Sequence, residues 1–181
     1  MSKPLLATLV VIAALLGALL ALFAVSLWPV SNDKLIHDFY LSETTSTVSP
    51  TDYLNHLTEG QTDWLVVDLR APGAYSAGHL VGAINIPAEG MSDAQMVEAF
   101  RALPAGKTTI NYCYSSYCSL SKKVGLVLSN NGIYAKDMSA GALEILRDYP
   151  GDIVNGTAPG DLRSVSGGPQ TCSAKGGNLS C

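Results

Sequence analysis

The stretch KTTINYCYSSYCSLSKKVGLVLS, residues 107–129, decides the fold that this sequence predicts. It begins with a β-rich run over 108–112, continues through a polar loop over 113–118, and ends with apolar residues at helical spacing. A strand that leads through such a loop into a helix places Cys113 near the unpaired N–H groups of the helix. That environment favours the thiolate, the nucleophilic form of cysteine. A buried structural cysteine is the alternative, against which the polar loop argues.

A long apolar run occupies the N-terminal part of the chain. Residues 5–27 contain no charged side chain. As a helix this run measures about 34 Å, enough to cross a hydrocarbon core of about 30 Å, and Trp28 follows where interfacial aromatic residues lie. We therefore predict an uncleaved, single-span membrane anchor over residues 4–30. A cleaved signal peptide is the alternative, but the run is longer than the usual apolar region of such a peptide.

Charge and cysteine content narrow the location and the partners. Lys3 precedes the span, so the positive-inside rule places residues 31–181 on the extracytoplasmic, periplasmic side of a cell membrane. The net charge of −4 disfavours nucleic acid as a partner. Four cysteines fit an oxidising compartment. Their C-x4-C-x53-C-x8-C spacing does not match a zinc pattern, so we expect no metal and no cofactor.

Beyond the span, the pattern predicts one α/β domain. Residues 31–48 are polar and rich in Ser and Thr, which favours an extended tether. Expected strands cover 64–68, 83–86, 108–112 and 133–138, and expected helices cover 50–57, 92–103, 119–129 and 142–147. Ser49 and Ser92 are expected to cap the first two of these helices. This alternation predicts a parallel sheet flanked by helices over residues 49–150. The Gly/Ser-rich, cysteine-containing tail over 151–181 is expected to hold little regular structure.

Three stretches make residues 49–150 resemble the rhodanese-like (sulfurtransferase) family. The first is similar to the family's D-x-R … Y/F-x-x-G-H-I-x-G-A-x-N-I-P run and comprises Asp68-Leu-Arg70, Tyr75, Gly78-His79-Leu80 and Gly82-Ala-Ile-Asn-Ile-Pro87. The second is Tyr112-Cys113, which opens a six-residue loop at the end of a strand. The third is Met138-Ser-Ala-Gly141, where family members often have L-x-G-G. The resemblance implies a rhodanese-like parallel sheet.

The resemblance also implies persulfide chemistry. In such domains the loop cysteine takes a sulfane sulfur from a donor, becomes a persulfide and passes the sulfur to an acceptor. Carried over, Cys113 is the catalytic residue and the partner is a small sulfur donor or a protein acceptor. The implied substrate-binding loop consists of Tyr114, Ser115, Ser116, Tyr117 and Cys118. Backbone N–H groups of such a loop can surround a sulfur anion.

The loop departs from the family pattern at two positions. Family loops often run C-x-x-G-x-R, whereas this chain has Ser116 in place of the glycine and Cys118 in place of the arginine. Without the arginine, an anionic donor such as thiosulfate loses a bidentate partner. A neutral, polysulfide or protein-bound donor is less affected by this change.

Cys118 admits several interpretations. It can form a disulfide with Cys113 if their Cα atoms approach within about 7 Å, or resolve an oxidised Cys113. It can instead fill the space of the arginine, or close the loop permanently and leave it inert. In the tail, we predict a Cys172–Cys181 disulfide, which would stabilise the chain by roughly 2–3 kcal/mol.

Other polar residues of the family run are expected to be structural. Asp68 and Arg70 lie at alternate positions, which favours an ion pair that orders the neighbouring loop. His79, in its Gly-His-x-x-Gly-Ala setting, is expected to be a hydrogen-bonded structural residue.

Three hypotheses for function follow. The first is a membrane-anchored, rhodanese-like sulfurtransferase with a persulfide on Cys113. The second is a catalytically inactive rhodanese-like subunit that binds or assembles a larger membrane complex. The third is a dithiol redox protein that uses Cys113 and Cys118.

Overall fold

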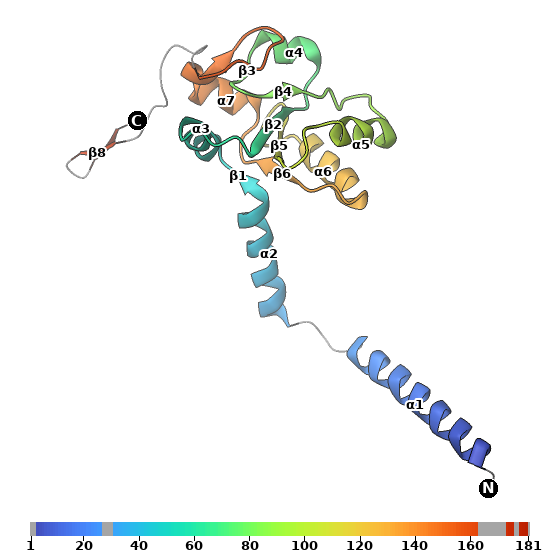
Figure 1. Cartoon of the computed structure of the whole chain (residues 1–181). Coiled ribbons are helices and arrows are strands. Elements are labelled where there is room, and N and C mark those ends of the chain that lie inside the picture. The colour runs from blue at the N-terminus through green and yellow to red at the C-terminus, as the bar shows by residue number, and fades with distance from the viewer. Residues whose placement is uncertain (1–2, 27–30, 163–172, 176–177, 181) are drawn as a thin grey trace. The chain divides into compact units, whose positions relative to one another are not determined.

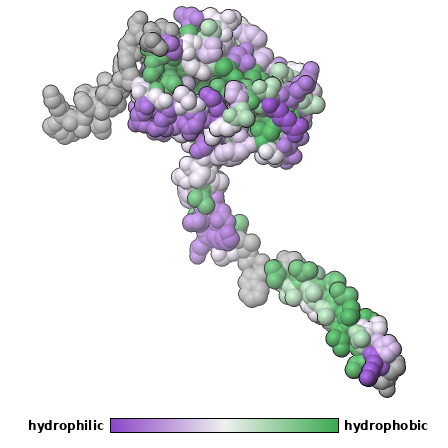
Figure 2. Space-filling model, in the orientation of Figure 1, coloured by the Kyte–Doolittle hydropathy of each residue, from purple (hydrophilic) through white to green (hydrophobic). Residues whose placement is uncertain are grey.

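The computed structural model describes residues 3–26, 31–162, 173–175 and 178–180, which divide into two compact units over 1–42 and 43–181. The first unit contains helix α1, Lys3–Ser26. Among the described residues, α1 is the one helix that is long and apolar enough to span a membrane, with a mean hydropathy of 2.8 over its best window. Figure 2 shows hydrophobic residues along most of this helix. By length and composition α1 is therefore a candidate anchor.

Helix α2, Asn32–Ser46, occupies most of the segment that the sequence predicts to be an extended tether. That prediction is wrong. Ser31 begins the helix, because its hydroxyl accepts a hydrogen bond from the N–H of Lys34 at 3.2 Å. An ion pair of 2.6 Å between Lys34 and Asp38 joins successive turns. The Ser and Thr residues over 42–47 suggested an extended segment, although Ser31, Lys34 and Asp38 favour a helix.

Five parallel strands form the main sheet, in the order β1-β6-β5-β2-β4. Their bounds are β1 Thr47–Val48, β2 Trp64–Asp68, β4 Ile84–Asn85, β5 Thr108–Tyr112 and β6 Ala135–Met138. The longest pairing joins β2 to β5, from Trp64 opposite Thr108 to Asp68 opposite Tyr112. The predicted α/β fold with a helix-flanked parallel sheet is confirmed.

Helices cover both faces of this sheet (Figure 1). Helices α3, Pro50–Thr58, and α7, Ala142–Asp148, contribute to one hydrophobic core. Helices α5, Asp93–Arg101, and α6, Leu120–Asn130, contribute to the other. Both predicted caps are present, since Ser49 caps α3 with Pro50 at its first turn and Ser92 begins α5 in a capping box.

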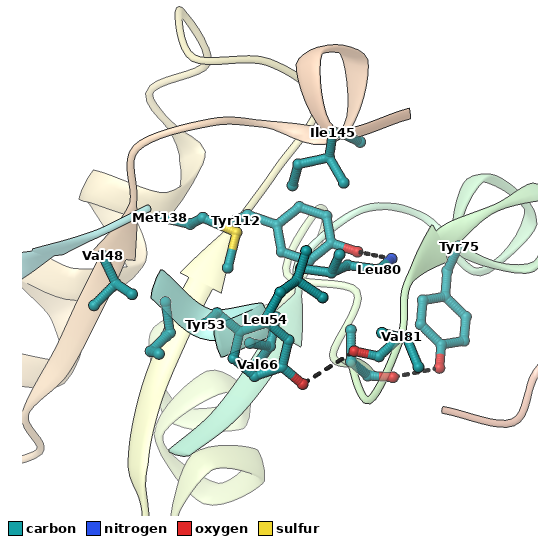
Figure 3. Packing of buried hydrophobic residues seen from close by; sticks show 13 residues of the cluster. Val48, Tyr53, Leu54, Val66, Tyr75, Leu80, Val81, Tyr112, Met138 and Ile145 are labelled. Carbon is teal, nitrogen blue, oxygen red and sulfur yellow. Dashed lines mark hydrogen bonds between the residues drawn. The ribbon is translucent and has the colours of Figure 1, made fainter. Parts of the chain in front are cut away.

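Buried tyrosines connect the first core to the loop that precedes β4 (Figure 3). The Tyr53 hydroxyl donates to Val81 O at 3.0 Å, and the Tyr75 hydroxyl donates to Ala83 O at 2.7 Å. Each ring thus buries its apolar body while its hydroxyl satisfies a backbone carbonyl. These bonds fix the family-like run over residues 75–87 against the sheet.

Several short elements differ from the sequence prediction. Helix α4, Pro72–Ala77, and strand β3, His79–Leu80, were not expected. Residues 151–181 are expected to hold little regular structure, and there a 3-10 turn, Pro150–Asp152, leads into the two-residue strand β7, Ile153–Val154, which pairs antiparallel with β3. Strands β8, Ser173–Lys175, and β9, Asn178–Ser180, pair with each other. Residues 172 and 181 lie outside the described residues, and with them the predicted Cys172–Cys181 disulfide.

Candidate functional site

Cys113 directly follows β5, at the carboxyl edge of the sheet. Strand alternation decides which way it faces: Ile110 and Tyr112 point into the core beneath α3 and α7, and Cys113 belongs to the core beneath α5 and α6. The loop over 113–118 then leads directly to α6, which begins at Leu120. The strand, cysteine, loop and helix thus follow one another as the sequence predicts.

The loop is held by the first residues of α7. The Ala142 N–H donates to Cys113 O at 2.8 Å, and the Leu143 N–H donates to Tyr114 O at 2.9 Å. Glu144 accepts from both the N–H and the hydroxyl of Ser116, at 3.1 and 3.0 Å. The backbone of the loop is therefore fixed by the otherwise unpaired N–H groups at a helix start.

Gly141 allows this close approach. A Cβ atom at position 141 would lie 2.2 Å from Ser115 Cα, closer than real Cβ contacts come. Its φ of −96° is open to any residue, so space, and not backbone conformation, requires the glycine. The N–H of Gly141 also donates to the Glu144 carboxylate at 3.0 Å. Gly141 therefore sets how closely the loop can approach α7.

Cys113 is buried, with 2% of its surface exposed, so the expectation of an exposed cysteine is wrong. Its thiol lies 3.6 Å from Cys118 O and 4.0 Å from Ser115 O. Burial, with the hydrogen bond to Cys118, raises the pKa of the Cys113 thiol, although backbone groups of Ser121 and Ser115 favour the anion. Cys113 therefore holds its proton at neutral pH, contrary to the thiolate that the sequence suggests.

The pKa of Cys118 shifts in the opposite direction. Partial burial opposes that charge, but a hydrogen bond from Cys113 and backbone groups of Leu120 and Tyr114 outweigh it and lower the pKa of Cys118. Both cysteines are free thiols. A permanent disulfide across the loop is therefore not present in this structure.

Hydrogen bonds join two carboxylates to the loop. The Tyr114 hydroxyl donates to Glu89 at 3.0 Å, and the charge of Glu89 opposes ionisation of Cys118. Glu144 contacts Ser116 on the other side. Tyr117, at the tip of the loop, is 95% exposed. The rim of the site is therefore acidic and presents one aromatic side chain to solvent.

The residues predicted to be structural lie beside the loop, away from the sulfur atoms. Arg70 contacts the buried Asp68 carboxylate at 2.6 Å and donates to Gly78 O at 2.7 Å. His79 is buried, stacks on the Tyr75 ring at 3.7 Å, and its ring nitrogens lie 2.9 Å from Tyr75 O and 3.0 Å from Ala158 O. These contacts support the structural roles that the sequence predicts for Asp68, Arg70 and His79.

Two further groups near the site were not identified from the sequence. Glu144 could have been found from its position, three residues after Gly141, where a helix start favours a carboxylate. Burial raises the pKa of Asp137, an effect that Ser121 at the start of α6 partly offsets. No pattern in the sequence indicates this effect, because it joins a strand to a helix across the sheet. Within the described residues, no group of three or more His, Cys, Asp or Glu side chains could hold a metal ion.

Comparisons with known proteins agree with this arrangement. Residues 49–143 match the family model of the rhodanese-like domain. The chain is 33% identical over 115 residues to the thiosulfate sulfurtransferase GlpE of Pseudomonas entomophila, a match that covers 61% of this chain and 94% of that protein. It is also 30% identical over 79 residues to an HTH-type transcriptional regulator of Mycobacterium tuberculosis, 44% of this chain, and it spans only 33% of that regulator's length.

Solved structures share the fold at lower sequence identity. The BH2092 protein of Bacillus halodurans superposes with a TM-score of 0.58 at 23% identity, covering 72% of this chain and 93% of that one. A full-length protein of Lactobacillus plantarum superposes with a TM-score of 0.55 at 22% identity, covering 69% of this chain and 99% of that one. Both are similar in the arrangement of the sheet and its helices.

Proposed function

Because this chain belongs to the rhodanese-like domain family, we propose that it is a sulfurtransferase that carries a sulfane sulfur as a persulfide on Cys113. The observation that carries the proposal is the position of the Cys113 sulfur, at the end of β5, where backbone groups of Ser115 and Ser121 favour its anion. A relative that is matched over 94% of its own length is named a thiosulfate sulfurtransferase. The roles of the site residues and the bounds of the domain, residues 49–150, belong to the same proposal.

In the proposed reaction the thiolate of Cys113 is the nucleophile. Backbone groups of Ser115 and Ser121 favour this anion, although burial raises the pKa of the thiol. The proton of the thiol passes to solvent, and the sulfur attacks the donor. A bond forms between Cys113 Sγ and the transferred sulfur, and the donor's leaving group departs with the electron pair of the broken bond. The product is a persulfide anion on Cys113.

The acidic side chains around the loop affect which sulfur donor can bind. Glu89 and Glu144 place carboxylates on two sides of the loop, and Cys118 provides no fixed positive charge. A small dianion such as thiosulfate therefore meets repulsion and no bidentate partner. We propose a polysulfide or a protein-bound persulfide as the donor, whose charge is lower or is held farther from the loop.

We further propose that α1 anchors the chain in a cell membrane, with the domain on the extracytoplasmic side. The exposed apolar surface of α1 and the single lysine before it support this topology. An impermeant protease added to intact spheroplasts should remove the domain. Protection in intact spheroplasts, with digestion only after lysis, would place the domain in the cytoplasm.

Mass spectrometry tests the persulfide directly. The full chain, with Cys172 and Cys181 replaced by serine, is purified in detergent, and its Cys118→Ser and Cys113→Ser variants are made for comparison. After treatment with polysulfide, thiosulfate or cysteine persulfide, we expect the tryptic peptide 108–122 of Cys118→Ser to gain the mass of one sulfur atom. The Cys113→Ser variant should gain none. If none of the three donors adds sulfur to Cys113, the proposed activity is wrong.

A second candidate function is a catalytically inactive module within a membrane complex. The burial of Cys113 and the exposed Tyr117 favour it, because a closed thiol limits chemistry and an exposed aromatic suits a protein contact. This function requires an interface of about 1,000 Å² or more. The chain extracted from native membranes should then migrate as a complex, and migration as a lone monomer would count against it.

A further inference from the structure

Cys118 returns over Cys113 through a tight turn. The Cys118 N–H donates to Ser115 O at 3.0 Å, which closes the turn, and the carbonyl of Cys118 lies 3.6 Å from the Cys113 sulfur. The turn thus brings Cys118 back beside Cys113. A disulfide between the two residues requires Cα atoms within about 7 Å of each other.

The two cysteines differ in how deeply they are buried and in which backbone groups lie near them. Cys113 is buried, whereas Cys118 is only half-buried. Backbone groups of Ser115 and Ser121 favour an anion on Cys113, and those of Tyr114 and Leu120 favour one on Cys118. The loop thus has two adjacent places for a negatively charged sulfur, one at the bottom of the site and one at its opening.

We propose that Cys118 is the resolving nucleophile of this site, which attacks the sulfur of the Cys113 persulfide, forms a Cys113–Cys118 disulfide and releases hydrosulfide. The inference rests on the proposed persulfide. In the step, a bond forms between Cys118 Sγ and Cys113 Sγ, and the bond from Cys113 Sγ to the outer sulfur breaks. The outer sulfur departs with that electron pair and takes the proton of Cys118. In this step the outer sulfur is reduced and Cys118 is oxidised, while Cys113 keeps one sulfur–sulfur bond throughout.

The alternative, transfer of the outer sulfur to Cys118, requires Cys113 to leave as a thiolate. Exchange is faster when the leaving thiol has a lower pKa. Because burial raises the pKa of the Cys113 thiol, Cys113 is a poor leaving group. Attack on Cys113 Sγ avoids this problem, since hydrosulfide is then the group that leaves.

Each cycle then ends in a disulfide that an external dithiol must reduce. Two thiols of that reductant return Cys113 and Cys118 to thiols and become a disulfide themselves. The half-buried Cys118 is the sulfur that such a reductant can reach first. The reaction sequence around this protein must therefore include a dithiol reductant and a reaction that consumes hydrosulfide.

A single-turnover experiment tests the resolving role. The reduced full chain in detergent, with Cys172 and Cys181 replaced by serine, is treated with polysulfide under anaerobic conditions, desalted, alkylated and digested. We expect peptide 108–122 of the parent to lose the mass of two hydrogen atoms, as a disulfide does. The Cys118→Ser variant should instead retain the mass of one added sulfur on Cys113. A Cys118→Ala variant checks that the serine hydroxyl does not itself react.

Hydrosulfide release provides the second readout. After loading with cysteine persulfide and rapid desalting, we expect Cys118→Ser to release hydrosulfide on the order of tenfold more slowly than the parent, because the attack is no longer intramolecular. Equal retention of a Cys113 persulfide by parent and variant would overturn the resolving role while leaving the proposed function standing. An added sulfur on Cys118 of the parent would overturn it too. No sulfur on Cys113 in Cys118→Ser would instead overturn the proposed function.

Discussion

Replacing Gly141 with alanine should displace the whole cysteine loop. The added Cβ would lie 2.2 Å from Ser115 Cα, so the two must move apart by about 1.2 Å to reach an ordinary contact of 3.4 Å. A shift of that size breaks the bonds from Ala142 to Cys113 and from Leu143 to Tyr114, now 2.8 and 2.9 Å. Overpacking costs about 1–3 kcal/mol and each lost hydrogen bond about 1 kcal/mol. We expect a destabilisation of about 3–5 kcal/mol.

The effect on sulfur loading should be larger than the effect on stability. A misplacement of about 1 Å at a reacting group costs about 100-fold in rate. We would measure loading of Cys113 by stopped-time mass spectrometry and stability by denaturant unfolding of the full chain in detergent. Gly125→Ala is the matched control, because position 125 lies inside α6 and has no neighbour within 4 Å. It should stabilise the helix by up to about 1 kcal/mol and load normally. A Gly141→Ala variant that loads as fast as wild type, with unchanged stability, would refute the packing argument.

Three further results follow from single contacts. Arg70→Ala should cost about 3–5 kcal/mol in unfolding free energy, because it leaves the buried Asp68 carboxylate unpaired; replacement of both residues by apolar ones should cost less. Glu144 has a lowered pKa, since hydrogen bonds from its own and neighbouring backbone groups outweigh desolvation. The ionised carboxylate should therefore contribute fully to stability above its ordinary pKa of 4.5, and this contribution should disappear as pH falls through the lower folded-state value. The difference in unfolding free energy between wild type and Glu144→Gln should accordingly vanish in acid. Cys113→Ala should raise the pKa of Cys118, which pH-dependent alkylation would report as slower reaction at neutral pH, because the thiol that donates to its anion is gone. An unchanged pH dependence of Cys118 alkylation in Cys113→Ala would contradict the effect of the Cys113 thiol on the pKa of Cys118.

The sequence predicted the elements whose residues repeat at a clear period. The run from β5 into α6 has apolar positions at helical spacing after a β-branched strand, and both agree with the structure. The caps at Ser49 and Ser92 were equally local and were also confirmed. What could not be predicted depends on contacts between distant segments. Strand β7 forms only because Ile153 lies opposite Leu80.

The chemistry of the site was harder to predict than its position. A polar loop suggested that Cys113 is exposed, but α7 covers the loop from a segment some thirty residues later in the chain. The sequence also could not show that Cys118 lies against Cys113, because loop spacing fixes no side-chain direction. The opposite shifts of the two pKa values depend on burial, on that contact and on nearby backbone groups, none of which the spacing shows.

The pairing of β3 with β7 has a practical consequence for how this protein is divided. The family match stops at residue 143, yet Asp152 and Pro159 supply the carbonyls that satisfy Val81 N and Gly82 N, and Ala158 supplies one for His79. A fragment cut at the end of the match would lose β7 and leave these donors facing water. Any shortened version meant to behave as the intact domain should therefore retain the chain through Leu162.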